Sequence, residues 1–485
     1  MNIASVALVR AAEQRVIASG NDGYRLMRRA GIAAARMIEE LFPRRKRTVI
    51  ICGGGNNGGD ALVAAAHLEG DVIVYSTSCA DDFRNESACA IRDLPENIPF
   101  VVFEEFPDGV FQSGDVIVDG LLGIGFHGEK LRAPAFSAIK KINASGLPTI
   151  SLDVPSGIDS DSGVVRDIAV RADVTITFGA VKQGLLCGEG PALCGILRAV
   201  DIGLGKVSTD DRALTFEEAR RLLPVFPADV HKNRRGELLI VAGSSDYSGA
   251  AALTSSAALR CGTGIVRLAT VDARKNLPCA LIVREYPAVD GVLPPDLWQK
   301  IGDFGKNSSA LAAGPGWGNV DPALLAGALD FAGGVVLDAD ALNALSRNPH
   351  LWRKRENIVL TPHPGEARRL AAAFDIEETE RSALARSLAL KLGATVLLKG
   401  KNTVVVSHEG EEKIILSGSS ALAVAGSGDV LTGIIGAFLA MGVSPFEAAC
   451  LGASLHGRVG EIAGGGAIAD DFVLILKDLL KELKI

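Results

Sequence analysis

The sequence predicts an α/β protein of two large domains, each a parallel sheet covered by helices on both faces. The chain has 485 residues, which is long enough for more than one domain. Short β-rich runs alternate with longer runs rich in Ala and Leu, as in βαβ units. Small aliphatic residues and 55 glycines carry the apolar content, because only 5% of the residues are aromatic. This composition is typical of an α/β enzyme and argues against disorder.

Charge and cysteine content indicate which partners and which cellular compartment to expect. The formal net charge of −7 predicts no general nucleic-acid-binding field. Residues 1–20 contain no apolar segment typical of a signal peptide, and the apolar stretch 430–443 is too short to span a membrane, so we interpret it as a buried helix. The 8 cysteines are scattered without a C-x-x-C pair. We therefore expect a reduced, cytoplasmic protein without nucleic-acid or membrane partners.

The β-rich runs fall into two series. In the first half they are residues 48–52, 72–75, 116–118, 149–152 and 174–178. The pattern weakens over 204–236, and a boundary near residue 210 gives domains of residues 1–210 and 211–485. In the second domain the expected strands are 238–241, 265–268, 310–313, 335–337, 358–360, 395–398, 403–406 and 413–416.

The first expected strand runs into a glycine loop, Gly53 to Asp60, that precedes an Ala-rich helix. Backbone N–H groups at such a helix start can hold a phosphate, and glycines let it approach closely. The spacing satisfies G-x-G-x-x-G, but the next strand ends in Ser76-Thr77-Ser78 and lacks the acid of an ordinary dinucleotide fold. The loop predicts a ligand site on a Rossmann-like sheet, and the alternative is a turn used only for packing.

Two aspartates follow other expected strands, Asp119 after 116–118 and Asp153 after 149–152. Ligands of open α/β sheets gather at the carboxyl ends of the strands. Asn57, Asp119 and Ser156 can therefore converge there as oxygen ligands for a hard cation. Asp153 is the candidate for proton transfer. The alternative is that each acid only caps the turn that follows it.

Four segments of the first half occur in a specific order: GGGNNGGD, VDGLLGIGFHGE, SLDVPSGID and TFGAVKQGLL. Over about residues 1–205 this combination resembles the NAD(P)H-hydrate epimerase domain, which interconverts the R and S forms of hydrated NADH or NADPH. The resemblance implies a potassium ion at Asn57, Asp119 and Ser156. It does not assign the proton transfer, for which we choose Asp153, with His127 as the alternative. The implied substrate contacts are Asn56, Asn57, Gly58, Gly59, Asp60, Gly123, Ile124, Gly125, Phe126, His127, Gly128, Glu129 and Asp153. Arg28 and Arg29 depart from the family, in which an acidic residue or Asn is expected in place of one arginine.

Ligand-type loops also follow the expected strands of the second domain. Small residues at 242–250 precede an Ala-rich helix, and a glycine loop at 314–318 follows another strand. His363 lies between two prolines, which fix the backbone on both sides of the imidazole and favour a ligand contact. Lys399 to Thr403 are expected to form a hairpin that brings a lysine near phosphates, and a solvated turn is the alternative.

The strongest signal is Ala425-Gly426-Ser427-Gly428-Asp429, immediately before an apolar helix. The glycines free helix N–H groups to stabilise the charge of a transferring phosphoryl group. Asp429 is placed to deprotonate an attacking hydroxyl. The alternative is an aspartate that only caps the helix.

This helix start resembles the ribokinase-like superfamily. The fuller set over about residues 215–485, namely GSSDYSGA, GPGWG, LDADALN, TPHPGE, KGKNT and GSGD, is similar to the ADP-dependent NAD(P)H-hydrate dehydratase domain. The resemblance implies substrate contacts at Ala250, Gly316, His363 and Asp429. It implies adenine-nucleotide contacts at Lys399, Gly400, Lys401, Asn402, Thr403 and Gly428. Trp317 stands where a smaller aliphatic residue is usual, either to fill a gap or to reshape the nicotinamide pocket, and Asn233 stands where glycine is usual.

Together the two resemblances imply a bifunctional isomerase and lyase that repairs hydrated NADH and NADPH. The C-terminal site, with ADP and Mg²⁺, would dehydrate the S form and release AMP and phosphate. The N-terminal site, with K⁺, would interconvert R and S. We expect small-molecule substrates and a homo-oligomer. One alternative is a ribokinase-like vitamin or sugar kinase fused to a nucleotide-binding domain. The other is an N-terminal module that only senses a ligand or binds a protein. The residues do not decide between ADP and ATP as the phosphoryl donor.

Overall fold

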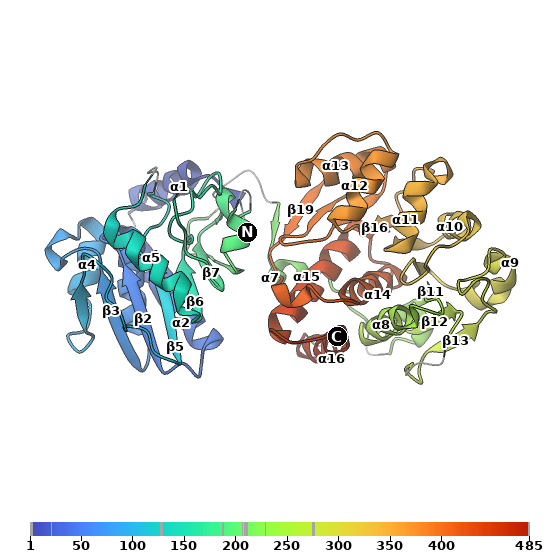
Figure 1. Ribbon diagram of the computed structural model, residues 1–485, viewed down its shortest axis with the longest axis horizontal. Coiled ribbons are helices and arrows are strands. Elements are labelled where there is room, and N and C mark those ends of the chain that lie inside the picture. The colour runs from blue at the N-terminus through green and yellow to red at the C-terminus, as the bar shows by residue number, and fades with distance from the viewer. Residues whose placement is uncertain are drawn as a thin grey trace. The chain divides into compact units, whose positions relative to one another are not determined.

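The computed structural model describes residues 3–20, 22–126, 130–165, 167–186, 189–205, 207, 212–227, 229–273 and 277–483. The chain forms two compact units, Met1–Ala213 and Leu214–Ile485 (Figure 1). Both contain a sheet with helices on its two faces, so the predicted α/β class is confirmed. No helix in the described part of the chain is both long and apolar enough to cross a membrane.

The first unit is built on a sheet with the strand order β4-β3-β2-β5-β6-β7-β9, and all of its pairings are parallel. The strands are β2 (Arg47–Cys52), β3 (Asp71–Ser76), β4 (Phe100–Val102), β5 (Asp115–Gly120), β6 (Thr149–Leu152), β7 (Val174–Phe178) and β9 (Ile196–Val200). All five predicted strands are present, and β4 and β9 are added at the edges. The strand order reverses between β2 and β5, and such a switch point is where open α/β sheets bind ligands.

Side chains alternate between the two faces along each strand of this sheet. On β2, Ile50 and Cys52 pack with one group of helices, whereas Val49 and Ile51 pack toward α5 (Ala133–Ser145). The first group includes α2 (Gly23–Leu41) and α3 (Asn56–His67). The unit also contains α1 (Val6–Ala18), α4 (Asn85–Arg92), α6 (Gly190–Leu193) and a small parallel pair, β1 (Ile3–Ala4) with β8 (Val181–Lys182). Burial on both faces explains why these strands read as continuous apolar runs.

The second unit contains a ten-stranded sheet with the order β10-β19-β18-β17-β16-β15-β14-β11-β12-β13. Pairings from β13 to β17 are parallel, and β17-β18 and β18-β19 are antiparallel. The strands are β10 (Ala213–Leu214), β11 (Glu237–Val241), β12 (Ile265–Thr270), β13 (Ile282–Glu285), β14 (Ala310–Ala313), β15 (Gly334–Leu337), β16 (Ile358–Leu360), β17 (Thr395–Leu398), β18 (Val404–Val406) and β19 (Glu412–Ile415). All eight predicted strands are present, with the predicted hairpin between β17 and β18. The order reverses between β11 and β14, which again defines a switch point.

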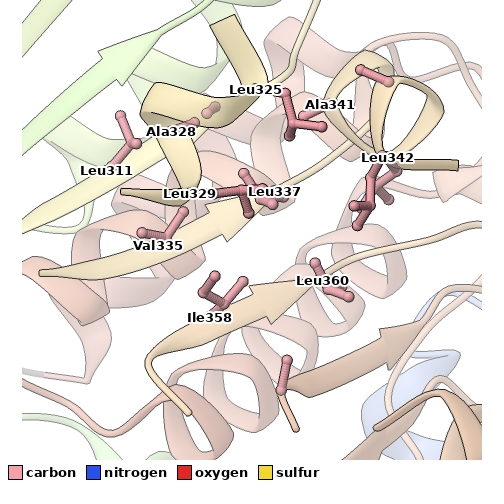
Figure 2. Packing of buried hydrophobic residues seen from close by; sticks show 14 of the residues in the cluster. Leu311, Leu325, Ala328, Leu329, Val335, Leu337, Ala341, Leu342, Ile358 and Leu360 are labelled. Carbon is pink, nitrogen blue, oxygen red and sulfur yellow. The ribbon is translucent and has the colours of Figure 1, made fainter. Parts of the chain in front are cut away.

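Helices cover both faces of this sheet as well. One apolar cluster joins it to α8 (Ser248–Arg260), α14 (Ser427–Ala440), α15 (Pro445–Ala463) and α16 (Ala469–Glu482). Another joins it to α9 (Leu297–Ile301), α10 (Pro322–Leu329), α11 (Asp340–Arg347), α12 (Pro364–Ala373) and α13 (Arg381–Leu392). Figure 2 shows strand residues such as Val335 and Leu337 packed beside Leu325 and Leu329 of α10 and Leu342 of α11. The helix predicted at 430–443 is α14, and it is buried along most of its length. A short helix, α7 (Phe216–Ala219), completes the set.

Candidate functional sites

The first site begins where β2 enters α3. The glycines of this turn are required by close backbone packing: a Cβ on Gly58 would lie 1.8 Å from the carbonyl oxygen of Gly53. They also have a second consequence, because the N-cap residue Gly55 provides no side-chain cap for α3. The first-turn N–H groups of α3 therefore lack a side-chain partner at the positive end of a helix, which suits an anion.

The end of the neighbouring strand carries a buried carboxylate, Asp119. Its two oxygens accept hydrogen bonds from Ser151 Oγ (2.7 Å), Ser156 Oγ (2.6 Å), Ser156 N (2.9 Å) and Leu121 N (3.2 Å). Burial raises the pKa of Asp119, and the bonds from Ser156 oppose that rise. The bond from Leu121 caps the turn that follows the strand. The bonds from Ser151 and Ser156 come from another part of the chain, so Asp119 is not only a turn cap. Four donors use all the ordinary acceptor positions of a carboxylate.

Asn57 lies beside this carboxylate. Its Nδ2 donates to the carbonyl oxygen of Leu122 at 2.8 Å, and Ser156 Oγ lies 3.1 Å from the same oxygen. The Asn57 Oδ1 is buried and has no hydrogen-bond partner in the described part of the structure. An unpaired buried oxygen, linked to a buried carboxylate through Leu122 and Ser156, fits a bound cation. Asn57, Asp119 and Ser156 thus lie together, with Asn57 Oδ1 as the unused acceptor and Asp119 as the compensating charge.

Asp153 adopts a left-handed backbone conformation with φ of 63°. Its carboxylate forms an ion pair with Lys182 and accepts a long bond of 3.4 Å from the backbone N–H of Phe178. Lys182 is fully buried, and its ammonium also donates to the carbonyl oxygen of Phe178 at 2.8 Å and to Thr177 Oγ1 at 3.2 Å. Asp153 therefore does not cap its own turn but faces a cation from β8, a strand of the small two-stranded pair. Lys182 lies within the TFGAVKQGLL segment, yet the sequence pattern did not assign it a role.

Asp153 and Lys182 line a small cavity of about 90 Å³, together with Glu13, Asp60 and Met27. Burial raises the pKa of Asp60 well above its usual value, with further contributions from Asp153 and Glu13. Burial also raises the pKa of Glu13, again with a contribution from Asp153. The cavity thus holds two carboxyl groups with a raised pKa, Glu13 and Asp60, and one buried ammonium, which is a suitable composition for proton transfer.

The other predicted contacts of this unit lie around the same edge of the sheet. A Cβ on Gly123 would lie 3.0 Å from the Cβ of Asn57, so the loop containing Gly123, Ile124, Gly125 and Phe126 passes beside the start of α3. His127, Gly128 and Glu129 lie outside the described residues. Arg28 is exposed, and Arg29 donates to the carbonyl oxygen of Ile202 at 3.1 Å.

The second site also lies at a carboxyl edge. Gly314 and Gly316 have φ values of 117° and 62°, and a Cβ on Gly316 would lie 3.0 Å from the Cβ of Ala250 at the start of α8. The loop is held to the start of α11 because Gly318 N donates to Asp340 Oδ2 at 2.8 Å. The predicted contacts Ala250 and Gly316 are therefore adjacent.

Trp317 lies in the same loop but points into the core. Its side chain is completely buried, and the indole N–H donates to the carbonyl oxygen of Val241 at 2.8 Å. Of the two alternatives for this residue, the structure supports the one in which it fills a gap.

Charged side chains meet around Lys399, at the end of β17. Its ammonium lies 2.7 Å from Asp338 Oδ1 and 4.0 Å from Glu366 Oε2. Burial disfavours the charged form, but these two carboxylates outweigh it and raise the pKa of Lys399. Asp338 also accepts a bond of 2.7 Å from Thr432 Oγ1 of α14. This network joins the ends of two strands to the first turns of α14. Asp338 and Glu366 lie within the LDADALN and TPHPGE segments, but the sequence assigned no role to them or to Thr432.

Asp429 is half-buried in the first turn of α14. The N-cap of this helix is Gly426, with φ of 84° and no side-chain cap, so the alternative that Asp429 caps the helix is wrong. Burial and the charge of Asp338 raise the pKa of Asp429 to about 7, although Lys399 opposes the shift. A carboxyl group with this pKa can accept a proton at neutral pH. Gly428 lies beside Lys399, since a Cβ there would be 3.4 Å from the ammonium nitrogen.

His363 caps α12. Its Nδ1 accepts from the backbone N–H of Gly365 at 2.9 Å, while Glu366 accepts from the backbone N–H of His363 at 2.8 Å. Burial and the nearby charge of Lys399 lower the pKa of His363. The ring is therefore held in a fixed orientation, and half of the side chain is exposed. A contact between His363 and substrate stays a prediction.

In the predicted hairpin Gly400 and Lys401 are exposed, but Asn402 is buried. Asn402 has a left-handed φ of 52°, is 7% exposed, and its Nδ2 has no hydrogen-bond partner in the described residues. An unpaired buried donor of this kind suits an acceptor atom on a ligand. The hairpin is joined to α13 through Arg381, which donates to the carbonyl oxygen of Leu398 at 3.1 Å.

Residues 238–477 match the family model described as NAD(P)H-hydrate dehydratase, and residues 23–184 match the model described as YjeF-related protein N-terminus. The bifunctional NAD(P)H-hydrate repair enzyme Nnr of Coxiella burnetii is 34% identical over 98% of this chain and 97% of its own length. The enzyme of the same name from Escherichia coli is 33% identical over 94% of this chain and 89% of its own length. The chain belongs to the bifunctional NAD(P)H-hydrate repair enzyme family.

Two solved structures are similar to part of the chain. An ADP/ATP-dependent NAD(P)H-hydrate dehydratase from Bacillus subtilis, co-crystallised with ATP/Mg²⁺, is 27% identical over 57% of this chain and all of its own, with a TM-score of 0.47. A ribokinase-like superfamily protein from Enterococcus faecalis covers 56% of the chain at 22% identity, with a TM-score of 0.49.

The chain is accordingly a bifunctional enzyme, an NAD(P)H-hydrate epimerase joined to an NAD(P)H-hydrate dehydratase. The predicted activity is confirmed at this level. The relatives are named bifunctional NAD(P)H-hydrate repair enzymes. These names favour neither of the two alternatives, a vitamin or sugar kinase or a non-catalytic N-terminal module.

Proposed function

We propose that Asp429 is the base of the dehydratase reaction and that the first turn of α14 binds the transferring phosphoryl group. Asp429 takes the proton of the substrate hydroxyl, and the hydroxyl oxygen forms a bond to the terminal phosphorus of ADP as AMP leaves. The ring nitrogen then assists departure of phosphate, and loss of a proton from the neighbouring carbon restores the reduced nicotinamide. The single observation that supports this assignment is the pKa of Asp429, raised to about 7 next to the unoccluded start of α14.

We propose that Lys399 binds the phosphates of the adenine nucleotide. The other proposed nucleotide contacts are Gly400, Lys401, Asn402, Thr403 and Gly428. In the structure the partner of Lys399 is the Asp338 carboxylate. Mg²⁺ would neutralise charge on the phosphates, and it commonly binds proteins through one or two carboxylates plus the phosphates themselves. This fits the described residues, among which no group of three or more His, Cys, Asp or Glu side chains forms a metal site alone.

The test is an absorbance assay at the reduced-nicotinamide band with the S hydrate of NADH. Asp429→Asn is expected to lower kcat by at least about 100-fold, as loss of a general base does. The epimerase activity of the same chain is the internal control and is expected to be unchanged. Recovery of NADH at the parent rate would contradict the assignment of Asp429. Separate assays with ADP and ATP decide the donor, for which we propose ADP.

For the epimerase we propose that Asp153 and Lys182 move the protons. The hydrated carbon carries a hydroxyl and the ring nitrogen. Its configuration is lost if a base takes the hydroxyl proton while the carbon–nitrogen bond breaks and the nitrogen is protonated, and re-closure on the other face gives the other form. The buried carboxylate and ammonium form a base and an acid in contact. Lys182→Met and Asp153→Asn are each expected to abolish epimerisation of the R hydrate and to leave dehydration of the S form intact.

K⁺ is proposed to bind at Asn57 Oδ1 and Ser156 Oγ, near the charge of Asp119. The support is the unpaired Oδ1 and the surrounding oxygen donors. Replacing K⁺ by tetramethylammonium at constant ionic strength is expected to slow epimerisation, and Asn57→Leu is expected to remove that difference. An equal rate in both salts would contradict the site. The homo-oligomer and the cytoplasmic location stay predictions.

A further inference from the structure

A buried histidine lies behind the phosphate-binding turn proposed above, on an element that the mechanism does not use. His456 belongs to α15, is 8% exposed, and its Nε2 lies 3.0 Å from Ser427 Oγ. Ser427 is the first residue of α14 and is itself buried. The imidazole packs edge-on against the ring of Phe472 of α16, with 6.3 Å between the ring centroids. His456 thus joins three helices at the point where the proposed anion site begins.

The imidazole is neutral at physiological pH. Burial lowers the pKa of His456 to about 4, and the positive charge of Lys399 contributes. A neutral imidazole adds no charge next to the start of α14, so the helix N–H groups and Lys399 keep their interaction with a phosphate. It retains one donor and one acceptor, which is enough to hold a serine hydroxyl in one orientation.

The first turn of α14 depends on such side-chain bonds, because Gly426 provides no cap. Thr254 of α8 donates to the carbonyl oxygen of Asp429 at 3.1 Å, on another side of the turn. The bond between Ser427 and His456 holds the turn from α15. The same stretch of α15 holds the preceding loop, since the Ser419 hydroxyl donates to the Gly460 carbonyl oxygen at 2.6 Å and Gly418 N donates to Glu461 Oε1 at 2.9 Å.

We propose that His456 is a positioning residue of the dehydratase, acting through Ser427 to fix the N–H groups of residues 427–429 in the geometry that binds the transferring phosphoryl group. The inference rests on the proposed role of the α14 start. His456 touches neither nucleotide nor substrate in this proposal. Its effect is on the preorganisation of the backbone donors, which sets how well charge in the transition state is stabilised.

The experiment compares Ser427→Ala, His456→Leu and the double variant in the dehydratase assay. Each single change is expected to lower kcat/KM for the nucleotide about tenfold, the consequence of losing one buried hydrogen bond. The double variant is expected to lose no more than either single one, because both remove the same interaction. His456→Gln retains an amide that can bond to Ser427 and is expected to recover most of the rate. KM for the hydrate and the epimerase rate are expected to stay at parent values.

Structural damage is separated from positioning by a matched variant of the same helix. Cys450 is buried on α15 and has no described bond to α14, so Cys450→Ala is expected to lower the melting temperature without changing kcat/KM for the nucleotide. If His456→Leu behaves like Cys450→Ala, or if the losses at Ser427 and His456 multiply, the positioning role is overturned. If Asp429→Asn is also fully active, the proposed role of the α14 start is wrong, and the positioning role of His456 fails with it.

Discussion

Asp429 is the carboxyl group that we propose as the base of the dehydratase. Its pKa is raised to about 7 by burial and by the charge of Asp338. A base must be deprotonated to act, so kcat for dehydration is expected to rise tenfold per pH unit below about pH 7 and to level off above it. The pH profile of the S hydrate reaction, recorded with saturating nucleotide, measures this. A flat profile between pH 5.5 and 8 would show that another group accepts the proton.

The same pKa makes a prediction about stability. In the unfolded chain an aspartate has a pKa of about 3.9. Because the folded-state pKa is higher, the folded state favours the protonated form, and the stability of the folded enzyme falls as pH rises from about 4 through 7. Asp429→Asn removes this ionisation. The variant is expected to gain melting temperature relative to the parent as the pH is raised from 5 to 8, and a constant difference at all pH values would contradict the raised pKa.

Replacing Lys182 is expected to destabilise the fold, because this lysine is a buried cation with carboxyl groups around it. Lys182→Met leaves Asp153 buried without its ionic partner, and breaking a buried ion pair in this way commonly costs about 3–5 kcal/mol. The variant is expected to unfold at lower denaturant concentration. Asp153→Asn combined with Lys182→Met removes both charges and is expected to recover part of that stability without recovering epimerase activity. A double variant less stable than Lys182→Met would contradict this account.

At the scale of elements, the start of α3 offers a test with a matched control. Gly58 and Gly55 lie in one glycine run, but only Gly58 faces backbone, with its Cβ position 1.8 Å from the Gly53 carbonyl oxygen; no atom lies within 4 Å of a Cβ at Gly55. Gly58→Ala is therefore expected to displace the loop and abolish epimerisation, whereas Gly55→Ala is expected to be tolerated. Activity and thermal unfolding of the two variants, measured side by side, check this prediction. Equal behaviour would show that the loop relaxes freely.

The elements differ in how far their sequences predict them. The central strands of both sheets are buried on two faces, so their sequences are continuous apolar runs, and β6, β14 and β17 begin and end where the sequence places them. The edge strands β4 and β13 escape prediction, because Val101, Val102 and Ile282 are partly exposed and their runs are short. Pairing with a neighbour, rather than local pattern, makes these segments strands.

The sites show a similar division. Glycine loops and aspartates that follow a strand directly are visible in the sequence, and the structure brings Asn57, Asp119 and Ser156 together as expected. Lys182 and His456 are different, since each meets its partner through the fold. Lys182 reaches Asp153 from the separate β1-β8 pair, and His456 reaches Ser427 between two helices. A lone Lys or His within an apolar segment gives no local sign of such a partner.

At the scale of the whole molecule, the chain holds two reactions in two compact units, and their products and substrates connect them. The R hydrate has to become S before dehydration. Asp153→Asn is therefore expected to recover NADH only from the S fraction of a mixed hydrate, and Asp429→Asn to recover none. Mixing the two variants, each with one active unit, is expected to restore full recovery, because the intermediate can diffuse from one chain to another. The mixture is compared with an equal concentration of active sites of the parent enzyme. Full recovery at the parent rate means that the S hydrate passes through solution. Recovery that stops at the S fraction would show that epimerisation and dehydration must occur on the same chain. That outcome would contradict the independence of the two units.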